Sequence, residues 1–190
     1  EGADVAELKQ RFLAYALDVN KDLDRCGFPL CKGNIMASNP QWCLTLEEWK
    51  DQFARWIRVP HPDALLNATI FFDFRPLYGQ AELAEAMRRH LLALTAATPV
   101  FLRAMAKNAL DVEPPLGKIR DFLTDLEPDH PGKIDLKKYG SRIFVDVARI
   151  YAMASGVHNT NSIQRLRLAA QRLNIRADEI NAVLEGLNFI

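Results

Sequence analysis

The sequence predicts a mainly α-helical fold: an antiparallel, up-and-down helical bundle with a long N-terminal helix and at most one short strand or small hairpin. Three observations lead to this prediction. Apolar residues recur at three- and four-residue steps along most of the 190 residues. Proline, glycine or a helix-capping residue separates the segments that have this spacing. Only the segment 68–75 has the β-branched and aromatic composition of a strand.

The first helix is expected over residues 4–25, and Gly27 and Pro29 end it. Its apolar stripe consists of Val5, Leu8, Phe12, Tyr15, Val19 and Leu23. The loop that follows, up to Pro40, is long for a compact domain, and long ordered loops are often functional. Its polar side chains, Asn39 among them, fit either a nucleotide-contacting loop or an ordered turn.

A second helix is expected to begin at Thr45. Thr45 and Glu48 have the spacing of a capping box, in which each residue satisfies a backbone N–H group of the other. Tryptophans dominate the apolar stripe of this helix, and we expect them to pack in the core. Pro60 and Pro62 then break the helix.

The expected strand, 68–75, contains a single acidic residue, Asp73. In a strand Asp73 and Arg75 share one face, while Phe72 and Phe74 share the other. A carboxylate on a buried strand requires a partner or a metal ion. Asp73 is therefore expected to belong either to a structural ion pair or to a site.

Beyond Gly79 the chain is expected to form several antiparallel helices with short connections, as in a bundle. Thr98 and Pro99 have the residue types of an N-cap and a first helical position. Ser141 is expected to cap a further helix that ends at Gly156, and two more helices follow, the first opening at Thr160. Between these helices the segment 117–139 is ambiguous, and we favour a small β-hairpin over a helix.

Charge balance, the length of apolar runs and cysteine spacing exclude several functional classes. The chain has 24 basic and 24 acidic residues, so it has no bulk signal for nucleic-acid binding. No apolar run approaches the roughly 18 residues that span a bilayer, and the first four residues have neither the basic n-region nor the apolar core of a signal peptide. The cysteines Cys26, Cys31 and Cys43 have neither disulfide-framework nor zinc spacing. We therefore expect a cytoplasmic protein without a membrane partner. Because the chain starts in a helical pattern without an initiator Met, we also expect it to be a piece of a longer protein.

The familiar catalytic signatures are absent: there is no Walker loop, glycine-rich dinucleotide motif, nucleophile elbow or His-Glu-x-x-His pair. What remains is a basic segment in which Lys137 and Lys138 precede Arg142 and Arg149. Clustered Lys and Arg near a helix N-terminus can bind phosphate. From the residues alone, a solvated helix face with i,i+4 pairs is the simpler interpretation.

Three groups of segments, in this order, resemble a known family. They are Cys-Lys-Gly-Asn-Ile-Met-Ala-Ser-Asn-Pro-Gln-Trp at 31–42 with Trp49 and Trp56; Ile-Phe-Phe-Asp-Phe-Arg at 70–75 with Gly79; and Ile-Asp-Leu-Lys-Lys-Tyr-Gly at 134–140, Val-Asp-Val-Ala-Arg-Ile-Tyr-Ala at 145–152, Asn159-Thr160 and Arg165-Leu166. The chain resembles the C-terminal part of bacterial putative nucleotidyltransferases related to the PII-protein uridylyltransferases. The resemblance implies that residues 1–78 are the C-terminal remnant of the nucleotidyltransferase domain. Residues 79–190 would form a helical substrate-binding bundle.

The same resemblance implies a reaction in which two metal ions, held by acidic residues, assist transfer of a nucleoside monophosphate to an acceptor hydroxyl. Magnesium and a nucleoside triphosphate are thus implied for the full enzyme, and no cofactor or metal for this chain alone. The family's Gly-Ser turn and strand-borne Asp-x-Asp pair are missing, since Asp22-Leu23-Asp24 lies on the first helix. Asp73 matches the place of the third metal-side acid. We expect the chain to be inactive on its own.

The residues implied in substrate binding are Asn39, Arg75, Lys137, Lys138 and Arg149. The implied partners are an upstream catalytic domain and an acceptor, which could be a PII-like signal-transduction protein, another protein or a small molecule. The alternative function is a helical interaction module without a ligand, which docks a partner protein or forms a homodimer.

Overall fold

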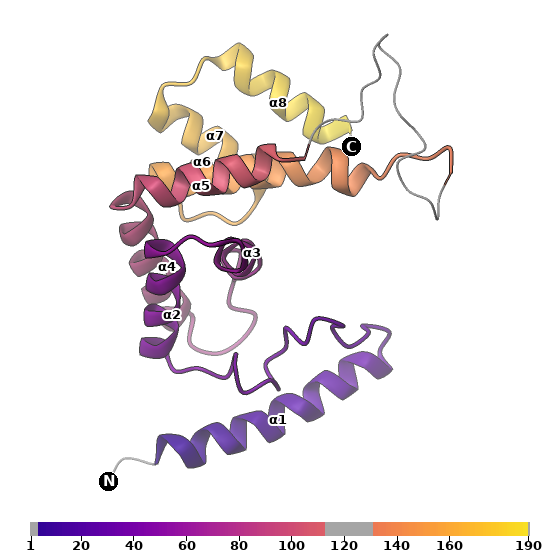
Figure 1. Cartoon of the computed structure of the whole chain (residues 1–190), viewed down its shortest axis with the longest axis vertical. Helices are drawn as coiled ribbons and strands as arrows, with labels where there is room; N and C mark the ends of the chain where they lie inside the picture. The colour runs from indigo at the N-terminus through magenta and orange to yellow at the C-terminus, as the bar shows by residue number, and fades with distance from the viewer. Residues whose placement is uncertain (1–3, 113–130, 190) are drawn as a thin grey trace. The chain divides into compact units, whose positions relative to one another are not determined.

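The computed structural model describes residues 4–112 and 131–189. Within these ranges the chain forms eight α-helices and one short π-helix, η1, and no strand (Figure 1). The predicted mainly α fold is confirmed. The chain divides into two compact units, Glu1–Asp51 and Gln52–Ile190. None of the helices in the described part combines the length and apolarity needed to cross a membrane.

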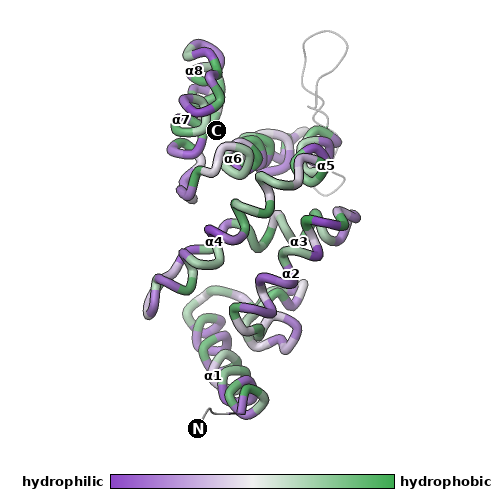
Figure 2. Tube along the Cα trace, turned by 90° about the vertical axis from the view of Figure 1, so that its left-hand side faces the viewer, coloured by the Kyte–Doolittle hydropathy of each residue, from purple (hydrophilic) through white to green (hydrophobic). Residues whose placement is uncertain are grey.

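The first unit is built around α1, Val5–Arg25. The side chain of Asp4 caps its start by accepting a hydrogen bond from the Ala6 N–H group at 3.0 Å. Beyond its end Gly27 has a φ of 92°, and the Phe28 N–H group donates to the Leu23 carbonyl. No residue of α1 is buried. Figure 2 shows hydrophobic and hydrophilic residues alternating along this helix.

The predicted capping box starts α2, Leu46–Arg58. The Thr45 N–H group donates to Glu48 Oε2 at 2.7 Å, and the Glu48 N–H group donates to Thr45 Oγ1 at 3.3 Å. Glu48 Oε1 also pairs with Lys9 Nζ of α1 at 2.6 Å. The core role predicted for the tryptophan stripe is confirmed at Trp56, which is 4% exposed and contacts the Phe53 ring edge-on.

The predicted strand at 68–75 is wrong, because α3, Pro62–Phe71, occupies its first half. Pro62 does not merely break the preceding helix; it occupies the first turn of α3, with His61 Nδ1 accepting from the Ala64 N–H group at 3.3 Å. Helical geometry buries Ala64 and Ala68 completely. Phe72 follows as C-cap and packs on Phe53 and Phe101, so tertiary burial overrides the local strand preference.

The remaining helices belong to the second unit. They are α4 (Ala81–Ala96), α5 (Pro99–Leu110), η1 (Lys137–Ser141), α6 (Arg142–Ser155), α7 (Ser162–Leu173) and α8 (Ala177–Phe189). Gly156 ends α6 with a φ of 67°, as predicted. The expected cap at Thr160 is off by one, because Asn161 accepts from the Gln164 N–H group. The predicted hairpin falls mainly on residues outside the described ranges, and its last residues, 136–139, are helical.

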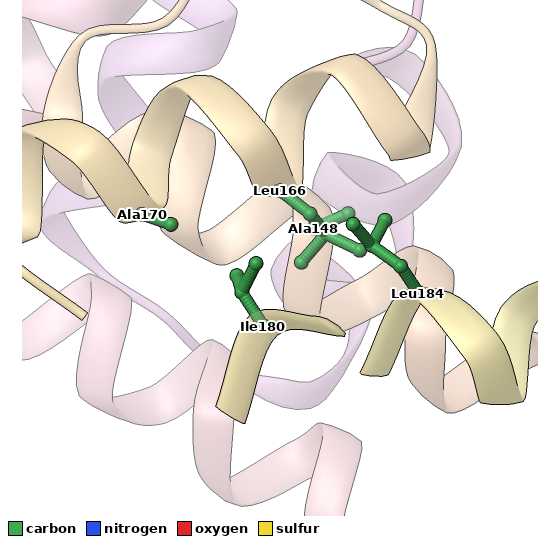
Figure 3. Close-up of a cluster of buried hydrophobic side chains, with 5 residues drawn as sticks. All are labelled: Ala148, Leu166, Ala170, Ile180 and Leu184. Carbon is green, nitrogen blue, oxygen red and sulfur yellow. The ribbon is translucent and has the colours of Figure 1, made fainter. Parts of the chain in front are cut away.

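Helix α6 is central to the second unit. It packs against α4, α5 and α7, and α7 in turn contacts α8; α5 and α6 run side by side (Figure 1). Figure 3 shows apolar side chains from α6, α7 and α8 converging in one cluster. The cluster consists of Ala148, Leu166, Ala170, Ile180 and Leu184. The alanines in it permit close approach of the helices, which holds α6 in place beside α7.

Candidate functional site

A groove of about 400 Å³ lies where η1 and the first turns of α6 meet α3. This volume is in the range of small-molecule sites. Four of its side chains are cationic and two are carboxylates, so it favours an anion. The residues that line it are Thr69, Asp135, Lys137, Lys138, Ser141, Arg142, Val145, Asp146 and Arg149.

Local sequence explains how the lysines reach the groove. The Asp135 side chain, and not the predicted Ser141, caps the helical segment: its Oδ1 accepts from the N–H groups of Lys137 at 2.9 Å and Lys138 at 3.0 Å. The chain then makes the wide turn of η1, a type of turn that recurs at functional sites. Both lysines are exposed, and Lys138 Nζ lies 4.8 Å from the centre of the Tyr139 ring.

The next groove residues lie on one face of α6. Arg142, Val145, Asp146 and Arg149 are spaced by three, one and three residues, which puts them on a single helical stripe. The Arg142 side chain is 48% exposed, and its Nε lies 3.6 Å from Asp146 Oδ2. Asp146 and Arg149, one turn deeper, are each 7% exposed.

The Arg149 guanidinium is held by two carboxylates. Its Nη1 donates to Asp146 Oδ1 at 2.5 Å, while Nε and Nη2 donate to Asp73 Oδ2 at 3.0 and 2.6 Å. These three bonds leave further N–H groups of the guanidinium without an acceptor among the described residues. The buried Arg149 guanidinium therefore forms part of the groove wall, and two of its five N–H groups make no hydrogen bond to the described residues.

Asp73 lies behind that wall. Its Oδ1 is 2.6 Å from Nη1 of Arg165, which is buried on α7 and donates through Nε to the Asn159 carbonyl. Burial by itself would raise the pKa of Asp73, but the hydrogen bonds and charges of Arg149 and Arg165 outweigh it and lower that pKa below its ordinary value. Of the two roles expected for Asp73, the described residues show the ion pair.

A third buried arginine completes the surroundings of Asp73. Arg88 of α4 donates through Nη2 to the Phe74 carbonyl, and its guanidinium carbon lies 4.5 Å from the centre of the Phe74 ring. Burial lowers the pKa of Arg88, and the charge of Arg165 acts in the same direction. The turn that carries Asp73 is thus held by α4, α6 and α7.

The described residues do not fit a two-metal centre. Both Asp73 oxygens face guanidinium groups, and no cluster of three or more His, Cys, Asp or Glu side chains within residues 4–112 and 131–189 could hold a metal ion. We therefore assign no chemical step to a metal ion here. The role of Asp73 as the third metal-side acid of a full enzyme stays a prediction.

The structure brings together three of the predicted binding residues, Lys137, Lys138 and Arg149. Arg75 is exposed and does not line the groove. Asn39 belongs to the first unit, where its side chain donates to the Asn34 carbonyl and accepts from the Gln41 N–H group, as in an ordered turn.

Asp146, Thr69 and Arg165 were not among the predicted site residues. The spacing of Arg142, Asp146 and Arg149 on one helix face indicated ion pairs, which were expected on a solvated face and not in a site. Nothing local points to Thr69 or Arg165, because α3 and α7 reach the site only through tertiary packing.

Comparison with known families matches most of the chain. Residues 2–63 match the family described as "Putative nucleotidyltransferase DUF294". Residues 99–190 match the "Putative nucleotidyltransferase substrate binding domain". No curated protein and no solved structure was found to match.

Proposed function

Since the chain belongs to this putative nucleotidyltransferase family and contains its substrate-binding domain, we propose that the basic groove binds the phosphates of a nucleotide substrate. The observation that carries the proposal is the Arg149 guanidinium, buried in the groove wall with N–H groups left for an anion. Lys137, Lys138 and Arg142 add exposed positive charge at the same groove.

The arrangement suits phosphate for two physical reasons. A guanidinium held by carboxylates is preorganised, so binding costs little side-chain entropy. Charge-assisted hydrogen bonds to phosphate are short and stronger than neutral ones. The exposed lysines can follow the charge of a flexible polyphosphate, because an ammonium group on a long stem has no fixed fork geometry.

The test is charge reversal at both lysines. An exposed ammonium–phosphate contact contributes up to about 1 kcal/mol, and reversal adds repulsion. The variant K137E/K138E should thus lose at least about 2 kcal/mol of binding free energy, roughly 30-fold in Kd. Isothermal titration calorimetry with ATP, UTP, GTP and CTP measures the loss.

The matched control is R103E/K107E on α5, which makes the same change in net charge at exposed residues outside the groove. It should bind nucleotide within about twofold of wild type, because these exposed charges do not line the groove and are screened by solvent and salt. Equal losses in both double variants would refute a site at the groove, and so would unchanged binding by K137E/K138E with its fold intact.

We further propose that this chain acts with an upstream nucleotidyltransferase domain that supplies the missing Gly-Ser turn and Asp-x-Asp pair. The resemblance alone supports uridylyl transfer, a PII-like acceptor, a role in bacterial signal transduction and a cytoplasmic location. The three free cysteines are consistent with a reducing compartment. The 190 residues alone should show no nucleotidyl transfer with magnesium and labelled nucleoside triphosphates. Sustained turnover in that assay contradicts this part of the proposal.

The proposed domain division at residue 78 can also be tested. The family matches leave residues 64–98 unassigned, and Asp73 in this interval pairs with α6 and α7. Residues 79–190 alone would leave Arg149 and Arg165 without that carboxylate. If 79–190 is nevertheless a complete domain, it should show a cooperative thermal transition in circular dichroism.

One observation favours the alternative of an interaction module. Helix α1 exposes large apolar side chains, and an apolar groove of about 560 Å³ runs between it and residues 37–45 of the first unit. Phe12 and Tyr15, which line the groove, are 61% and 69% exposed. If the chain dimerises through this surface, F12E/Y15E should turn a dimer into a monomer in light scattering while nucleotide binding is unchanged.

A further inference from the structure

A buried carboxylate inside a groove for anions requires an explanation. Asp146 lines the groove, and its side chain is 7% exposed. Its negative charge repels a phosphate at short range. A carboxylate in this position weakens anion binding unless it does something else for the groove.

The contacts of Asp146 show what that is. Its Oδ1 accepts from Arg149 Nη1 at 2.5 Å, and its Oδ2 lies 3.6 Å from Arg142 Nε. One carboxylate thus lies between two guanidiniums that both line the groove. All three residues come from the same face of α6.

The two arginines depend on Asp146 to different degrees. Arg149 is also held from the opposite side by Asp73, through Nε and Nη2. Arg142 is 48% exposed, and Asp146 is its ion-pair partner within the described part of the chain. Without Asp146, Arg142 would be free to turn into solvent, and the Nη1 edge of Arg149 would lose its acceptor.

We propose that Asp146 is a positioning residue for substrate binding: it holds the guanidiniums of Arg142 and Arg149 side by side in the groove, so that both can donate to one phosphate group. This inference rests on the proposed function of the groove. It adds that the groove recognises phosphate through a fixed pair of guanidiniums as well as through net positive charge.

The two explanations of the groove predict opposite signs for one substitution. If the groove works only through its net charge, removing a negative charge in D146N strengthens anion binding. If Asp146 positions the arginines, D146N weakens binding in spite of the more favourable charge. We expect Kd for pyrophosphate and for ATP to rise about tenfold, the size of one lost charge-assisted hydrogen bond.

The matched control is D135N, which removes the other carboxylate of the groove. Asn is as good a helix cap as Asp, so the bonds to the N–H groups of Lys137 and Lys138 can persist. This variant should bind pyrophosphate more tightly than wild type. Calorimetry of the full 190-residue chain at low salt, with circular dichroism to verify folding, measures both variants.

A second variant tests the inference if D146N does not fold. R142K keeps the positive charge but lacks the fork that Asp146 orients, and its side chain is exposed enough to tolerate the change. It should lose about fivefold to tenfold in affinity for pyrophosphate, since a lysine cannot donate in the same paired geometry. Binding equal to wild type by R142K, or equal or tighter binding by folded D146N, overturns the inference while the proposed function stands. A wild-type chain that binds neither pyrophosphate nor any of the four nucleotides overturns both.

Discussion

Replacing Asp73 with asparagine should destabilise the second unit by about 3 kcal/mol. The carboxylate pairs with Arg149 and Arg165, whose side chains are 7% and 4% exposed. An asparagine can keep one hydrogen bond but leaves two buried guanidiniums facing a neutral group. Removing one partner of a buried ion pair costs about 3–5 kcal/mol. The Asp73 side chain is itself 28% exposed, so solvent screening puts its loss at the lower end of that range.

Thermal unfolding followed by circular dichroism measures this cost. At about 2–4 °C per kcal/mol for a chain of this size, D73N should lower Tm by roughly 6–12 °C at pH 7. The control is E185Q, which neutralises an exposed carboxylate on α8 that has no ion pair in the described structure. A D73N shift no larger than that of E185Q would refute the reasoning that this carboxylate joins the turn after α3 to α6 and α7.

The pH dependence provides a second check on the same residue. Although burial alone would raise the pKa of Asp73, its arginine partners lower that pKa in the folded state. The stabilisation is therefore complete above the unfolded pKa of about 4 and is lost as pH falls through the lower, folded value. The Tm difference between wild type and D73N should thus shrink when both are measured below pH 4. A difference that stays constant down to pH 2 would show that the carboxylate charge is not responsible.

Two further predictions concern local packing and capping. Hydrogen bonds from Lys9 and Thr45 lower the pKa of Glu48 to about 2, so its carboxylate should titrate near pH 2 in an NMR titration. A titration midpoint near pH 4 would show that these hydrogen bonds do not persist. A Cβ on Gly186 would lie 2.9 Å from Phe144 Cζ, so G186A should lower stability by about 1 kcal/mol in urea unfolding, the overpacking cost exceeding the gain in helix propensity. Stabilisation by G186A would show that the Phe144 ring moves aside freely.

Local signals in the sequence were sufficient for much of the helical structure. The capping box of Thr45 and Glu48 and the left-handed cap at Gly156 depend on neighbours within one turn, and both predictions are confirmed. The segment 68–75 shows the limit of such signals. Its composition favours a strand, but Phe72 is buried against Phe53 and Phe101, which are distant in sequence. No sheet partner is available within the described residues, and the helical face of α3 buries its alanines instead.

For the candidate site, the sequence alone shows a cluster of Lys and Arg near the start of one helix. Clustered Lys and Arg near a helix N-terminus can bind phosphate, but only the family resemblance named Lys137, Lys138 and Arg149 as substrate contacts. The structure places all three along one groove. The ion pairing of Asp73 depends on tertiary contacts: its carboxylate accepts from Arg149 across 76 residues of chain. No pattern of spacing encodes such a pair, because the two residues meet only when the turn after α3 packs on α6 and α7. That packing turns an isolated acid into the counter-ion of a buried, preorganised arginine.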